Sequence, residues 1–520
     1  MKNNKKKRPA LLIILDGWGL SNKINGNAIT LAATPYFDSF LENYAYSTLN
    51  ASGQYVGLPK GQAGNSEAGH MNISAGFVVE QDASIINRSI DQGTFFKNQV
   101  FIEASKHVIK YKSDIHLIGL LSENSSPHAS KEHIKALVNL FLRQTKQNIY
   151  LHFFTDGRDS SVFSALKVLP SILNNFDKKR VKLASIIGRF YAMDRKNSWS
   201  RTKLAYEALV LGKSITARNG LEAINQAYNR GESDEFIMPT VITHQGKPLG
   251  TINDNDAVVF FNLRSDRARQ LTKALVQKNF NKRNPNSFKR IRKIKNLFFV
   301  ALTDFGRDLD NVLTAFPSID IPHTLVDVLS DRRQLYIAER EKYAHITYFF
   351  NGGYDRATQG EKRLFLPSPD VVSYNLAPTM NLPLLTTKVI NFIKNDQYDF
   401  ITLNVANPDM VGHSGDLEAS IKAVEEVDKC LGALVKVINK KKGFTIITAD
   451  HGNIEEMIDH ETGEIRTMHT TNLVPFIIVD KYKKYKLKKK GKLANIAPTI
   501  LEILKINKPK SMKAKSLIIK

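Results

Sequence analysis

Residues 61–76 read GQAGNSEAGHMNISAG, and the interpretation of the whole chain depends on them. The glycines at 61, 64, 69 and 76 leave little side chain to pack, which is typical of a loop whose backbone comes close to another group. Ser66 precedes a segment that can open a helix. It could cap that helix by accepting a hydrogen bond from a backbone N–H. It could equally be a nucleophile at a helix N-terminus, where the dipole and free N–H groups favour phosphate.

Length and composition indicate a soluble protein of more than one domain. A chain of 520 residues is too long for one simple core, and its 42% hydrophobic and 24% charged residues are ordinary values. A single cysteine, Cys430, excludes an internal disulfide and fits a reducing compartment. The apolar run Ala10–Leu15 ends at Asp16, too short for a signal peptide, and no run reaches the roughly 18 apolar residues of a membrane span. We expect a cytoplasmic protein with no membrane partner.

The formal net charge of +24 is the unusual global feature. Basic residues cluster in Lys2–Arg8, Lys282–Lys295 and Lys481–Lys492, mostly as lysine. A nucleic-acid-binding protein is the alternative from another functional class that this charge raises. No zinc-finger spacing, basic zipper or RNA-recognition motif accompanies the clusters. We therefore expect solvated surface and no nucleic-acid partner.

Short apolar runs recur along the chain, and each ends in polar residues. We interpret the runs as buried, mainly parallel strands with helices between them. In open α/β sheets, ligands bind beyond the carboxyl ends of such strands. The runs are Leu11–Leu15, Ile115–Leu121, Ile149–Phe154, Lys182–Ile187, Ala257–Phe261, Phe400–Val405 and Phe444–Thr448.

The polar residues after these runs fall into two chemical sets. The outer parts of the chain supply oxygen and imidazole groups, namely Asp16, Ser66, Asp409, His413, Asp450, His451 and His469. The middle supplies mostly guanidinium groups, namely His128, Arg158, Asp159, Arg189, Arg195, Arg264 and Arg267. The first set suits metals and the second suits phosphate and carboxylate. We predict an α/β fold in which residues 1–79 and 317–520 form an outer domain and residues 80–316 an inserted one.

The outer set has the composition of a two-metal site. Asp409 and His413 are four residues apart and would share one face of a helix. Adjacent Asp450 and His451 follow a strand, and His469 lies in a third segment. Two divalent ions fit this number of ligands better than one, and paired ions serve phosphate chemistry. Mixed carboxylate and imidazole ligands suit manganese or zinc better than calcium, and an ion on the Ser66 oxygen would lower its pKa.

Nine motifs stand in an order that resembles one enzyme family: LDGWG, GNSEAGH, DGRD, GRFYAMDR, FFNLRSDRARQ, EKYAHITYFFNGG, NPDMVGHSG, TADHGN and MHTTNLVPF. The chain resembles the cofactor-independent phosphoglycerate mutases, which belong to the alkaline-phosphatase-like metalloenzymes. The resemblance runs from about Leu11 to Leu517.

The resemblance assigns the metal ligands and the nucleophile. It implies that Asp409, His413 and His469 bind one manganese ion, and that Asp16, Ser66, Asp450 and His451 bind the other. It also implies that Ser66 becomes phosphorylated and that 2,3-bisphosphoglycerate is not needed. We expect a monomer that acts on a small molecule.

The arginine set suits a ligand with a phosphate and a carboxylate. Arg264 and Arg267 lie three residues apart, so both can face one cleft. The resemblance assigns the phosphoglycerate to Arg158, Asp159, Arg189, Arg195, Arg264 and Arg267, with His128 beside them. It makes Asp159 the general base and places Lys342 between the two domains, where it neutralises charge on the moving phosphoryl group. From the sequence alone, Lys342 is an ordinary surface lysine.

The activity implied by the resemblance is the interconversion of 3-phosphoglycerate and 2-phosphoglycerate, in glycolysis and gluconeogenesis. A phosphomonoesterase or a phosphosugar mutase on the same metal core is the nearest alternative. Free glycerate must be kept from water between the two transfers, so domain closure is expected, with hinges near Val79 and Phe316.

Two segments depart from the family pattern. SENSSPHAS, around His128, carries one apparent inserted residue, and Lys196-Asn197-Ser198 replaces residues that are usually acidic and basic. We expect the second departure to affect only residues around the site.

Overall fold

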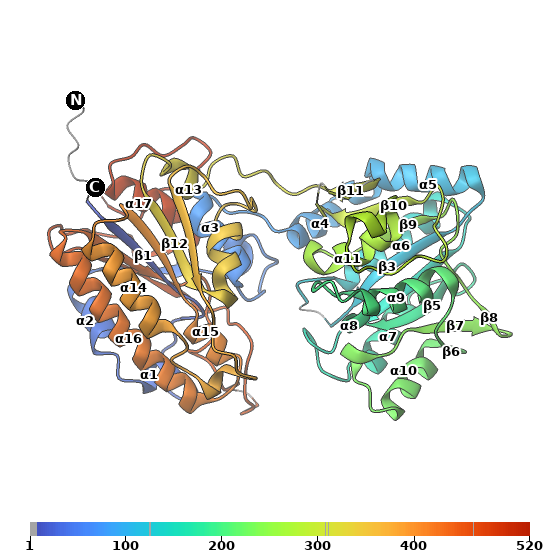
Figure 1. The fold of residues 1–520 in the computed structure, drawn as a ribbon, viewed down its shortest axis with the longest axis horizontal. Helices are drawn as coiled ribbons and strands as arrows, with labels where there is room; N and C mark the ends of the chain where they lie inside the picture. Colours follow the sequence, from blue (N-terminus) through green and yellow to red (C-terminus); the bar gives the residue numbers. More distant parts are fainter. Residues whose placement is uncertain (1–7, 124–125, 307, 310, 461, 520) are drawn as a thin grey trace. The chain divides into compact units, whose positions relative to one another are not determined.

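The computed structural model describes residues 8–123, 126–306, 308–309, 311–460 and 462–519. The chain divides into two compact units, shown in Figure 1. Unit 1 contains residues 1–81 and 319–520, and unit 2 contains residues 82–318. These limits lie two residues from the boundaries expected from the sequence.

Unit 1 is built on an eight-stranded sheet with the order β13-β12-β14-β1-β15-β16-β2-β17. The strands are β1 (Ala10–Leu15), β2 (Ala45–Asn50), β12 (Gln334–Glu339), β13 (Glu361–Leu366), β14 (Phe400–Val405), β15 (Phe444–Thr448), β16 (Val474–Val479) and β17 (Lys490–Lys492). The five strands from β13 to β15 are parallel, whereas β16 runs antiparallel to both of its neighbours. The N-terminal strand thus lies between two strands from the C-terminal part of the chain.

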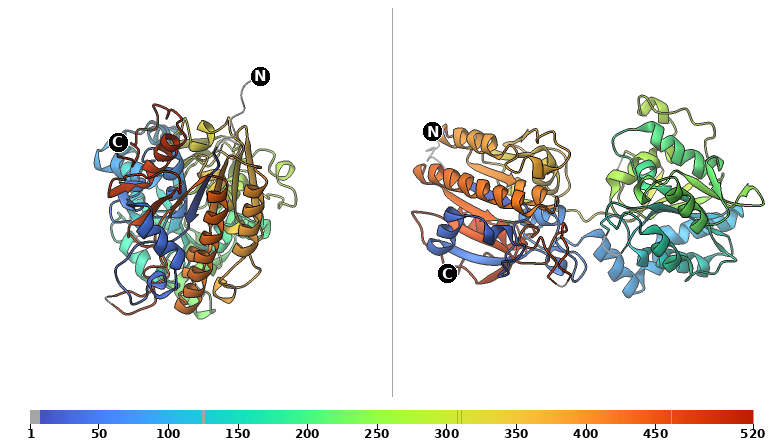
Figure 2. Two further views of the ribbon diagram at one scale, coloured as in Figure 1. Left: turned by 90° about the vertical axis from the view of Figure 1, so that its left-hand side faces the viewer. Right: turned by 90° about the horizontal axis from the view of Figure 1, so that it is seen from below.

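Helices cover both sides of this sheet. Helices α1 (Ala28–Leu31), α2 (Pro35–Asn43), α14 (Leu382–Lys394) and α16 (Leu417–Lys440) form one group. The second group contains α3 (Ser66–Ala75), α13 (Leu325–Val328) and α17 (Ile496–Ile503), and α15 (Asn407–Gly412) follows β14. Figures 1 and 2 show the two groups on either side of the strands. Strand β1, read as ALLIIL, is buried at every position because both faces of the sheet are covered.

Unit 2 contains a second sheet with the order β11-β10-β9-β3-β4-β5-β7-β6, and β8 pairs with β7. Its strands are β3 (Ile115–Leu121), β4 (Ile149–Thr155), β5 (Val181–Gly188), β6 (Ile215–Ala217), β7 (Thr240–His244), β8 (Lys247–Pro248), β9 (Ala257–Phe260), β10 (Phe298–Thr303) and β11 (Val312–Phe316). Its helices are α4 (Asp82–Asp91), α5 (Gln99–Tyr111), α6 (Lys131–Gln144), α7 (Ala165–Leu173), α8 (Arg189–Ala192), α9 (Trp199–Leu211), α10 (Gly220–Asn229), α11 (Ser265–Val276) and α12 (Phe280–Arg283). Each unit has its own apolar core around its sheet.

The predicted α/β fold class is confirmed, and all seven predicted strands lie within one residue of an observed strand at each end. Continuous apolar runs could be located well because these strands are buried on both faces. The sheets are nevertheless mixed, since β16 in unit 1 and β7 in unit 2 each have antiparallel neighbours.

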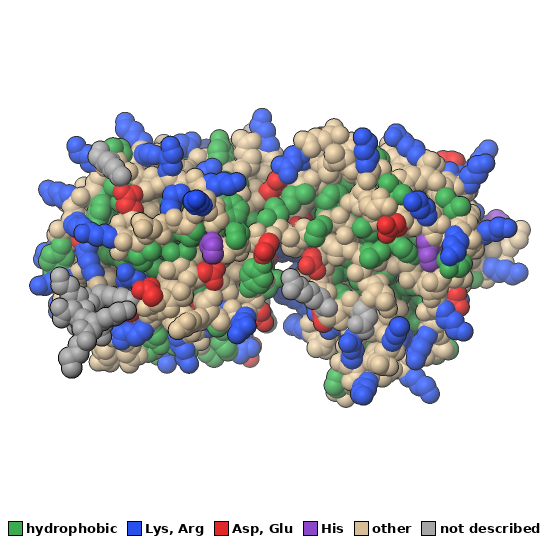
Figure 3. Space-filling view, turned by 90° about the horizontal axis from the view of Figure 1, so that it is seen from above, with side chains coloured by type: hydrophobic (Ala, Val, Ile, Leu, Met, Phe, Trp, Pro, Cys, Tyr) green, Lys and Arg blue, Asp and Glu red, His purple; other side chains and the backbone are tan. Residues whose placement is uncertain are grey.

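The basic residues are distributed over the surface, and some support the fold. Figure 3 shows lysine and arginine side chains spread over the visible face of each unit. In the Lys282–Lys295 cluster, buried Arg290 donates hydrogen bonds to the carbonyls of Ala274 (2.9 Å) and Gln277 (2.6 Å), at the C-terminus of α11. A guanidinium there satisfies carbonyls that the helix itself leaves unpaired. In the Lys2–Arg8 cluster, residues 2–7 lie outside the described residues.

A chain of buried polar side chains crosses the unit 2 sheet. His116 Nε2 lies 3.0 Å from Asp256 Oδ2, and His116 Nδ1 lies 2.9 Å from His152 Nε2. His152 Nδ1 lies 2.8 Å from Ser185 Oγ. The Asp256 carboxylate can only accept a hydrogen bond, so His116 Nε2 must donate to it. With both rings neutral, His116 Nδ1 then accepts from His152 Nε2, and His152 Nδ1 accepts from the Ser185 hydroxyl. Burial lowers the pKa of His152 well below its ordinary value of 6.5, and His116 lowers it further.

We predict that unit 2 loses stability in mild acid through His152. Folded His152 resists protonation, whereas the unfolded chain binds the proton near pH 6.5. Below that pH the free energy of unfolding should therefore fall, by up to about 1.4 kcal/mol per pH unit. Urea unfolding between pH 5 and 7, followed by the fluorescence of Trp199 in a Trp18→Phe background, measures this slope.

His152→Gln removes the titrating ring and keeps a donor for His116. The slope of its unfolding free energy against pH should therefore lose the contribution of one proton, up to about 1.4 kcal/mol per pH unit. The matched control is His244→Gln, at an exposed position of β7. Equal slopes for His152→Gln and the parent protein would show that His152 does not carry the acid sensitivity.

Candidate active site

In unit 1, the ends of three neighbouring parallel strands bring the acidic residues together. Asp16 follows β1, Asp409 lies in α15 just after β14, and Asp450 follows β15. Ser66 is the first residue of α3, and His451 follows Asp450. The parallel register places these groups at one edge of the sheet, as expected for an open α/β sheet.

The helix cap of α3 is Asn65, whose side-chain oxygen accepts a hydrogen bond of 2.9 Å from the Ala68 N–H. Ser66 is therefore not needed as the cap, and its hydroxyl is directed elsewhere. Ser66 Oγ lies 3.1 Å from Asp16 Oδ1 and 2.9 Å from His451 Nε2. This geometry favours the interpretation of Ser66 as a reactive group.

The first predicted ligand group converges closely. His413 Nε2 and His469 Nε2 lie 3.3 Å and 3.2 Å from Asp409 Oδ1, and 3.2 Å from each other. Each Nδ1 lies 2.8 Å from a backbone carbonyl, that of Thr467 for His413 and that of Gly64 for His469. Carbonyls only accept, so each Nδ1 carries a proton, and each Nε2 presents a lone pair when the ring is neutral. Two such lone pairs facing one carboxylate suit a bound cation.

The second predicted group also converges. His451 Nε2 lies 3.4 Å from Asp16 Oδ1 and 3.6 Å from Asp450 Oδ2, with Ser66 Oγ beside them. Asp450 Oδ2 accepts no hydrogen bond among the described residues, although His70 Nδ1 lies 3.2 Å from it. Burial lowers the pKa of His451, but Asp450 and Asp16 outweigh burial and raise it to about 9. The carboxylates thus favour positive charge at this position.

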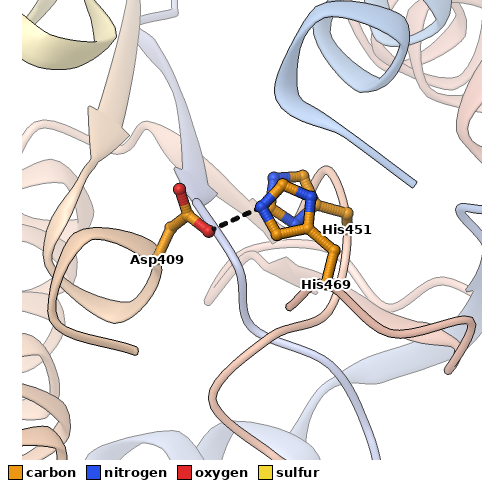
Figure 4. Close-up of side chains that lie close together, drawn as sticks. All are labelled: Asp409, His451 and His469. Atoms are coloured by element: carbon orange, nitrogen blue, oxygen red, sulfur yellow. Dashed lines mark ion pairs between the residues drawn. The ribbon is translucent and has the colours of Figure 1, made fainter. Parts of the chain in front are cut away.

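His451 lies near both groups. Its ring stacks on His469 with centroids 3.9 Å apart, and metal-ligand atoms of Asp409, His451 and His469 all lie within 4.8 Å of one another. Figure 4 shows these three side chains and the Asp409–His469 ion pair.

Lys342, in the short 3₁₀ turn η4 (Arg340–Lys342) after β12, is buried in the same site. Its Nζ donates to Asp16 Oδ1 and Asp409 Oδ2, both at 2.6 Å, and to Ser66 Oγ at 2.9 Å. Burial disfavours the ammonium, but the two carboxylates outweigh burial and raise the pKa of Lys342. The resemblance named Lys342; its spacing in the sequence carries no such signal.

The charges of this site suit divalent cations. Asp16, Asp409 and Asp450 are buried, and Lys342 offsets one of their three negative charges when the histidines are neutral. Buried charge without a counter-charge is costly, so additional cations would stabilise the arrangement. The residues present therefore fit the divalent ions that the sequence predicts.

Three residues that the sequence analysis did not assign contact the predicted ligands. Asn453 Nδ2 donates to Asp409 Oδ1 at 2.8 Å, and Asn404 Nδ2 donates to Asp16 Oδ2 at 2.7 Å. His70 Nδ1 lies 3.2 Å from Asp450 Oδ2. Asn404 could have been noticed as an amide within the apolar strand FITLNV, and the other two lie inside quoted motifs.

In unit 2, the predicted cationic residues gather at the ends of β3, β4 and β5 and at α11. Arg189 pairs with Asp156 and with Asp159 Oδ2, the latter at 2.6 Å. His128 Nε2 lies 3.7 Å from the same Asp159 oxygen. Burial and then Arg189 lower the pKa of His128 to about 4. Asp156, the first residue of the DGRD motif and one for which the sequence predicted no role, thus helps to hold Arg189.

The other four predicted arginines belong to the same charged cluster as Arg189. Arg195 Nη1 lies 2.7 Å from Asp266 Oδ2, and the half-exposed Arg158 lies 3.6 Å from Glu235. Burial lowers the pKa of Arg264 to about 10. Burial and the nearby Arg189 and Arg195 also lower the pKa of Arg267. So much positive charge at one place suits an anion with more than one acidic group.

The two departures from the family pattern lie beside this cluster. Asn124 and Ser125, within SENSSPHAS, lie outside the described residues, whereas His128 is described. In the second departure, the N–H groups of Lys196 and Ser198 donate to Asp194 Oδ1 at 3.1 Å and 2.9 Å.

Comparison with known proteins identifies the family. The sequence matches the Metalloenzyme superfamily over residues 8–508. It is 46% identical over 516 residues to the 2,3-bisphosphoglycerate-independent phosphoglycerate mutase of Clostridium kluyveri, covering 98% of this chain and 99% of that protein. It is 47% identical over 520 residues to the 2,3-bisphosphoglycerate-independent phosphoglycerate mutase 1 of Methanosarcina acetivorans, covering 99% of this chain and 99% of that protein. The chain belongs to the 2,3-bisphosphoglycerate-independent phosphoglycerate mutase family.

A solved structure of a phosphoglycerate mutase agrees with this assignment. The crystal structure of Leishmania mexicana phosphoglycerate mutase at low cobalt concentration matches with a TM-score of 0.82 and 29% identity, covering 99% of this chain and 98% of that one. The mutase family predicted from the motifs is therefore confirmed, and with it the metalloenzyme fold class. Within the described residues, no helix is long and apolar enough to cross a membrane.

We predict that Gly69→Ala damages the mutase site although alanine normally favours a helix. In a helix interior this change would stabilise by about 1 kcal/mol. Here the added Cβ would lie 2.7 Å from both Cβ and O of Asp450, so α3 or Asp450 must move. A ligand shift approaching 1 Å can reduce turnover a hundredfold. Mutase assays and thermal unfolding of the variant should show both lower turnover and a lower Tm.

Gly61→Ala is the matched control in the same loop. Its φ of +79° costs an alanine about 1–2 kcal/mol, but no neighbouring atom lies within 4 Å of the added Cβ. It should lower Tm without lowering turnover. Full turnover in Gly69→Ala would mean that the close approach of α3 to Asp450 is not required.

Proposed function

We propose that this chain interconverts 3-phosphoglycerate and 2-phosphoglycerate through a phosphoserine at Ser66, with two divalent ions and without 2,3-bisphosphoglycerate. The observation that carries the proposal is the position of Ser66 Oγ, 2.9 Å from both Lys342 Nζ and His451 Nε2 and 3.1 Å from Asp16 Oδ1. The full-length relatives named for this activity support it. They do not favour a phosphomonoesterase or a phosphosugar mutase.

The metal ions would be held by the two groups of residues described above. Asp409, His413 and His469 would bind one ion, and Asp16, Ser66, Asp450 and His451 the other. Oxygen and nitrogen donors together favour manganese. Ions bound there would supply positive charge that stabilises the phosphoryl oxygens and the ionised Ser66 hydroxyl.

The residues of unit 1 carry out the transfer to and from Ser66. Ser66 Oγ forms a bond to phosphorus as the bond from phosphorus to the glycerate oxygen breaks, which leaves phosphoserine and glycerate. Lys342 lies close enough to donate a hydrogen bond to the reacting oxygens, where an ammonium stabilises developing negative charge. The N-terminus of α3 presents further N–H groups to the anion.

The residues of unit 2 would hold glycerate between the two transfers. Arg264, Arg267, Arg189, Arg195 and Arg158, with His128, would bind its carboxylate and the phosphate of the substrate. Protonated Asp159 would give its proton to the departing glycerate oxygen, and the resulting carboxylate would take a proton from the hydroxyl that attacks phosphoserine. The second attack restores Ser66, so the reaction needs no further phosphate donor.

We further propose that the protein is a monomer in the cytoplasm.

The proposal predicts the behaviour of one coupled assay. The purified chain with manganese should convert 3-phosphoglycerate without added 2,3-bisphosphoglycerate, and a chelator should abolish turnover, which manganese then restores. Ser66→Ala should fold and be inactive, because the Asn65 cap remains. Quenching with substrate and mapping phosphopeptides should locate phosphate on Ser66. Turnover by metal-free protein, or phosphate on a histidine, would refute the proposal.

A second prediction separates a mutase from a phosphatase. Asp159→Asn keeps the shape of the side chain but removes the base, and it weakens the pairing with Arg189. Phosphoserine should still form in part, whereas transfer onward should slow, since one charge-assisted contact contributes roughly 1.5–3 kcal/mol. Released inorganic phosphate should therefore rise relative to mutase turnover, with both products measured in one reaction.

Asp177→Asn, at an exposed position of unit 2, is the control and should leave the ratio of phosphate release to mutase turnover unchanged. If Asp159→Asn also leaves that ratio unchanged, Asp159 supports the fold and does not take part in proton transfer.

A further inference from the structure

His70 lies one helical turn after Ser66 in α3 and is completely buried. Its Nδ1 lies 2.8 Å from the backbone carbonyl oxygen of Ser66. Its Nε2 lies 3.0 Å from Nδ2 of Asn404, a buried residue of β14. Both ring nitrogens are therefore engaged: Nδ1 with the Ser66 carbonyl and, at 3.2 Å, with Asp450 Oδ2, and Nε2 with the central sheet.

The contacts of Asn404 fix which nitrogen of His70 carries the proton. Asn404 Nδ2 lies 2.7 Å from Asp16 Oδ2, and the carboxylate can only accept a hydrogen bond. The amide nitrogen must therefore face Asp16, and its second hydrogen points to His70 Nε2. His70 Nε2 accepts, so Nδ1 carries the proton and donates it to the Ser66 carbonyl.

This tautomer gives His70 a role different from that of a metal ligand. Ligand atoms of Asp16, His70 and Asp450 lie within 4.8 Å of one another, so distance alone would admit His70 to a metal site. A ligand needs a free lone pair, however, and that of Nε2 is used by Asn404 while Nδ1 is protonated. We propose that His70 and Asn404 are a positioning pair for the mutase reaction and not ligands.

The pair acts on two separate parts of the site. His70 holds the first turn of α3 through the Ser66 carbonyl. Asn404 occupies Oδ2 of Asp16, which leaves Oδ1 for Ser66 Oγ and Lys342 Nζ. The hydrogen bond between His70 and Asn404 joins these effects, so the serine hydroxyl and the Asp16 oxygen keep one relative position. Such neighbours of ligands usually change metal affinity ten- to hundredfold when removed.

The test is a calorimetric titration of the metal-free full chain with Mn²⁺, and it rests on the proposed function because it requires the parent protein to bind two ions. His70→Ala and Asn404→Ala should still bind two ions, one of them ten- to hundredfold more weakly, and turnover should recover at saturating Mn²⁺. His70→Asn keeps a donor near Nδ1 and loses the Nε2 acceptor. Its affinity should lie between those of His70→Ala and the parent chain.

Asn72→Ala controls for general loosening of α3. Asn72 is buried in the same helix and donates to the carbonyls of Val56 (3.0 Å) and Ala68 (2.8 Å), neither of which is a predicted ligand. It should lower Tm with unchanged Mn²⁺ affinity. An equal loss of affinity in Asn72→Ala would overturn the positioning role.

The other results separate this inference from the proposed function. Binding of one ion by His70→Ala, without recovery at high Mn²⁺, would make His70 a ligand and overturn the inference alone. Unchanged affinity in both alanine variants would also overturn it while leaving the two-metal proposal intact. Failure of the parent chain to bind two ions would overturn both.

Discussion

Lys342 donates hydrogen bonds of 2.6 Å to both Asp16 and Asp409, and all three side chains are buried. Carboxylates brought this close repel one another, and the repulsion grows as the surroundings become less polar. The parallel pairing of β14, β1 and β15 places Asp409, Asp16 and Asp450 at one edge of the sheet. The arrangement therefore depends on positive charge among the carboxylates, which Lys342 supplies in part.

The order of the strands explains why both ends of the chain are needed for this site. Ile13 of β1 pairs with Leu403 of β14 on one side and with Ile447 of β15 on the other. The central strand of unit 1 therefore has no partners until the C-terminal half of the chain is present. Unit 2, in contrast, is continuous in sequence and has its own core. An insertion of this kind adds a binding surface without interrupting the strands that carry the ligands.

The fold class could be predicted, because strands buried on both faces read as continuous apolar runs. The polar residue after each run then identifies the functional edge of the sheet, as with Asp16 and Asp450. Ser66 was ambiguous, since a serine beside a helix start is equally a cap, and only the observed bond from Ala68 to Asn65 separates the two. Family motifs were needed to assign Lys342.

The supporting residues could not be predicted, for a physical reason. Asn404 and His70 are 334 positions apart, and their role can be recognised only from the hydrogen bond between them. Asp156 likewise reads as a turn residue after a strand, and its role in holding Arg189 depends on β5 lying beside β4. Sequence spacing within one element carries information about side chains that share a face, but hydrogen bonds between distant elements leave no periodic signal.

In the proposed reaction, residues other than the nucleophile distinguish a mutase from a phosphatase. With the proposed divalent ions bound, carboxylates, imidazoles and a serine at a strand edge would suffice to cleave a phosphate ester, and water could complete that reaction. A mutase must also keep an alcohol that carries one carboxylate and two hydroxyls, and must return phosphate to the other hydroxyl. A guanidinium can bind a carboxylate through two parallel hydrogen bonds. The guanidinium groups of unit 2 gather around Arg189 and Arg267. The specificity of the proposed reaction thus depends on unit 2, whereas its chemistry depends on the balance of charges in unit 1.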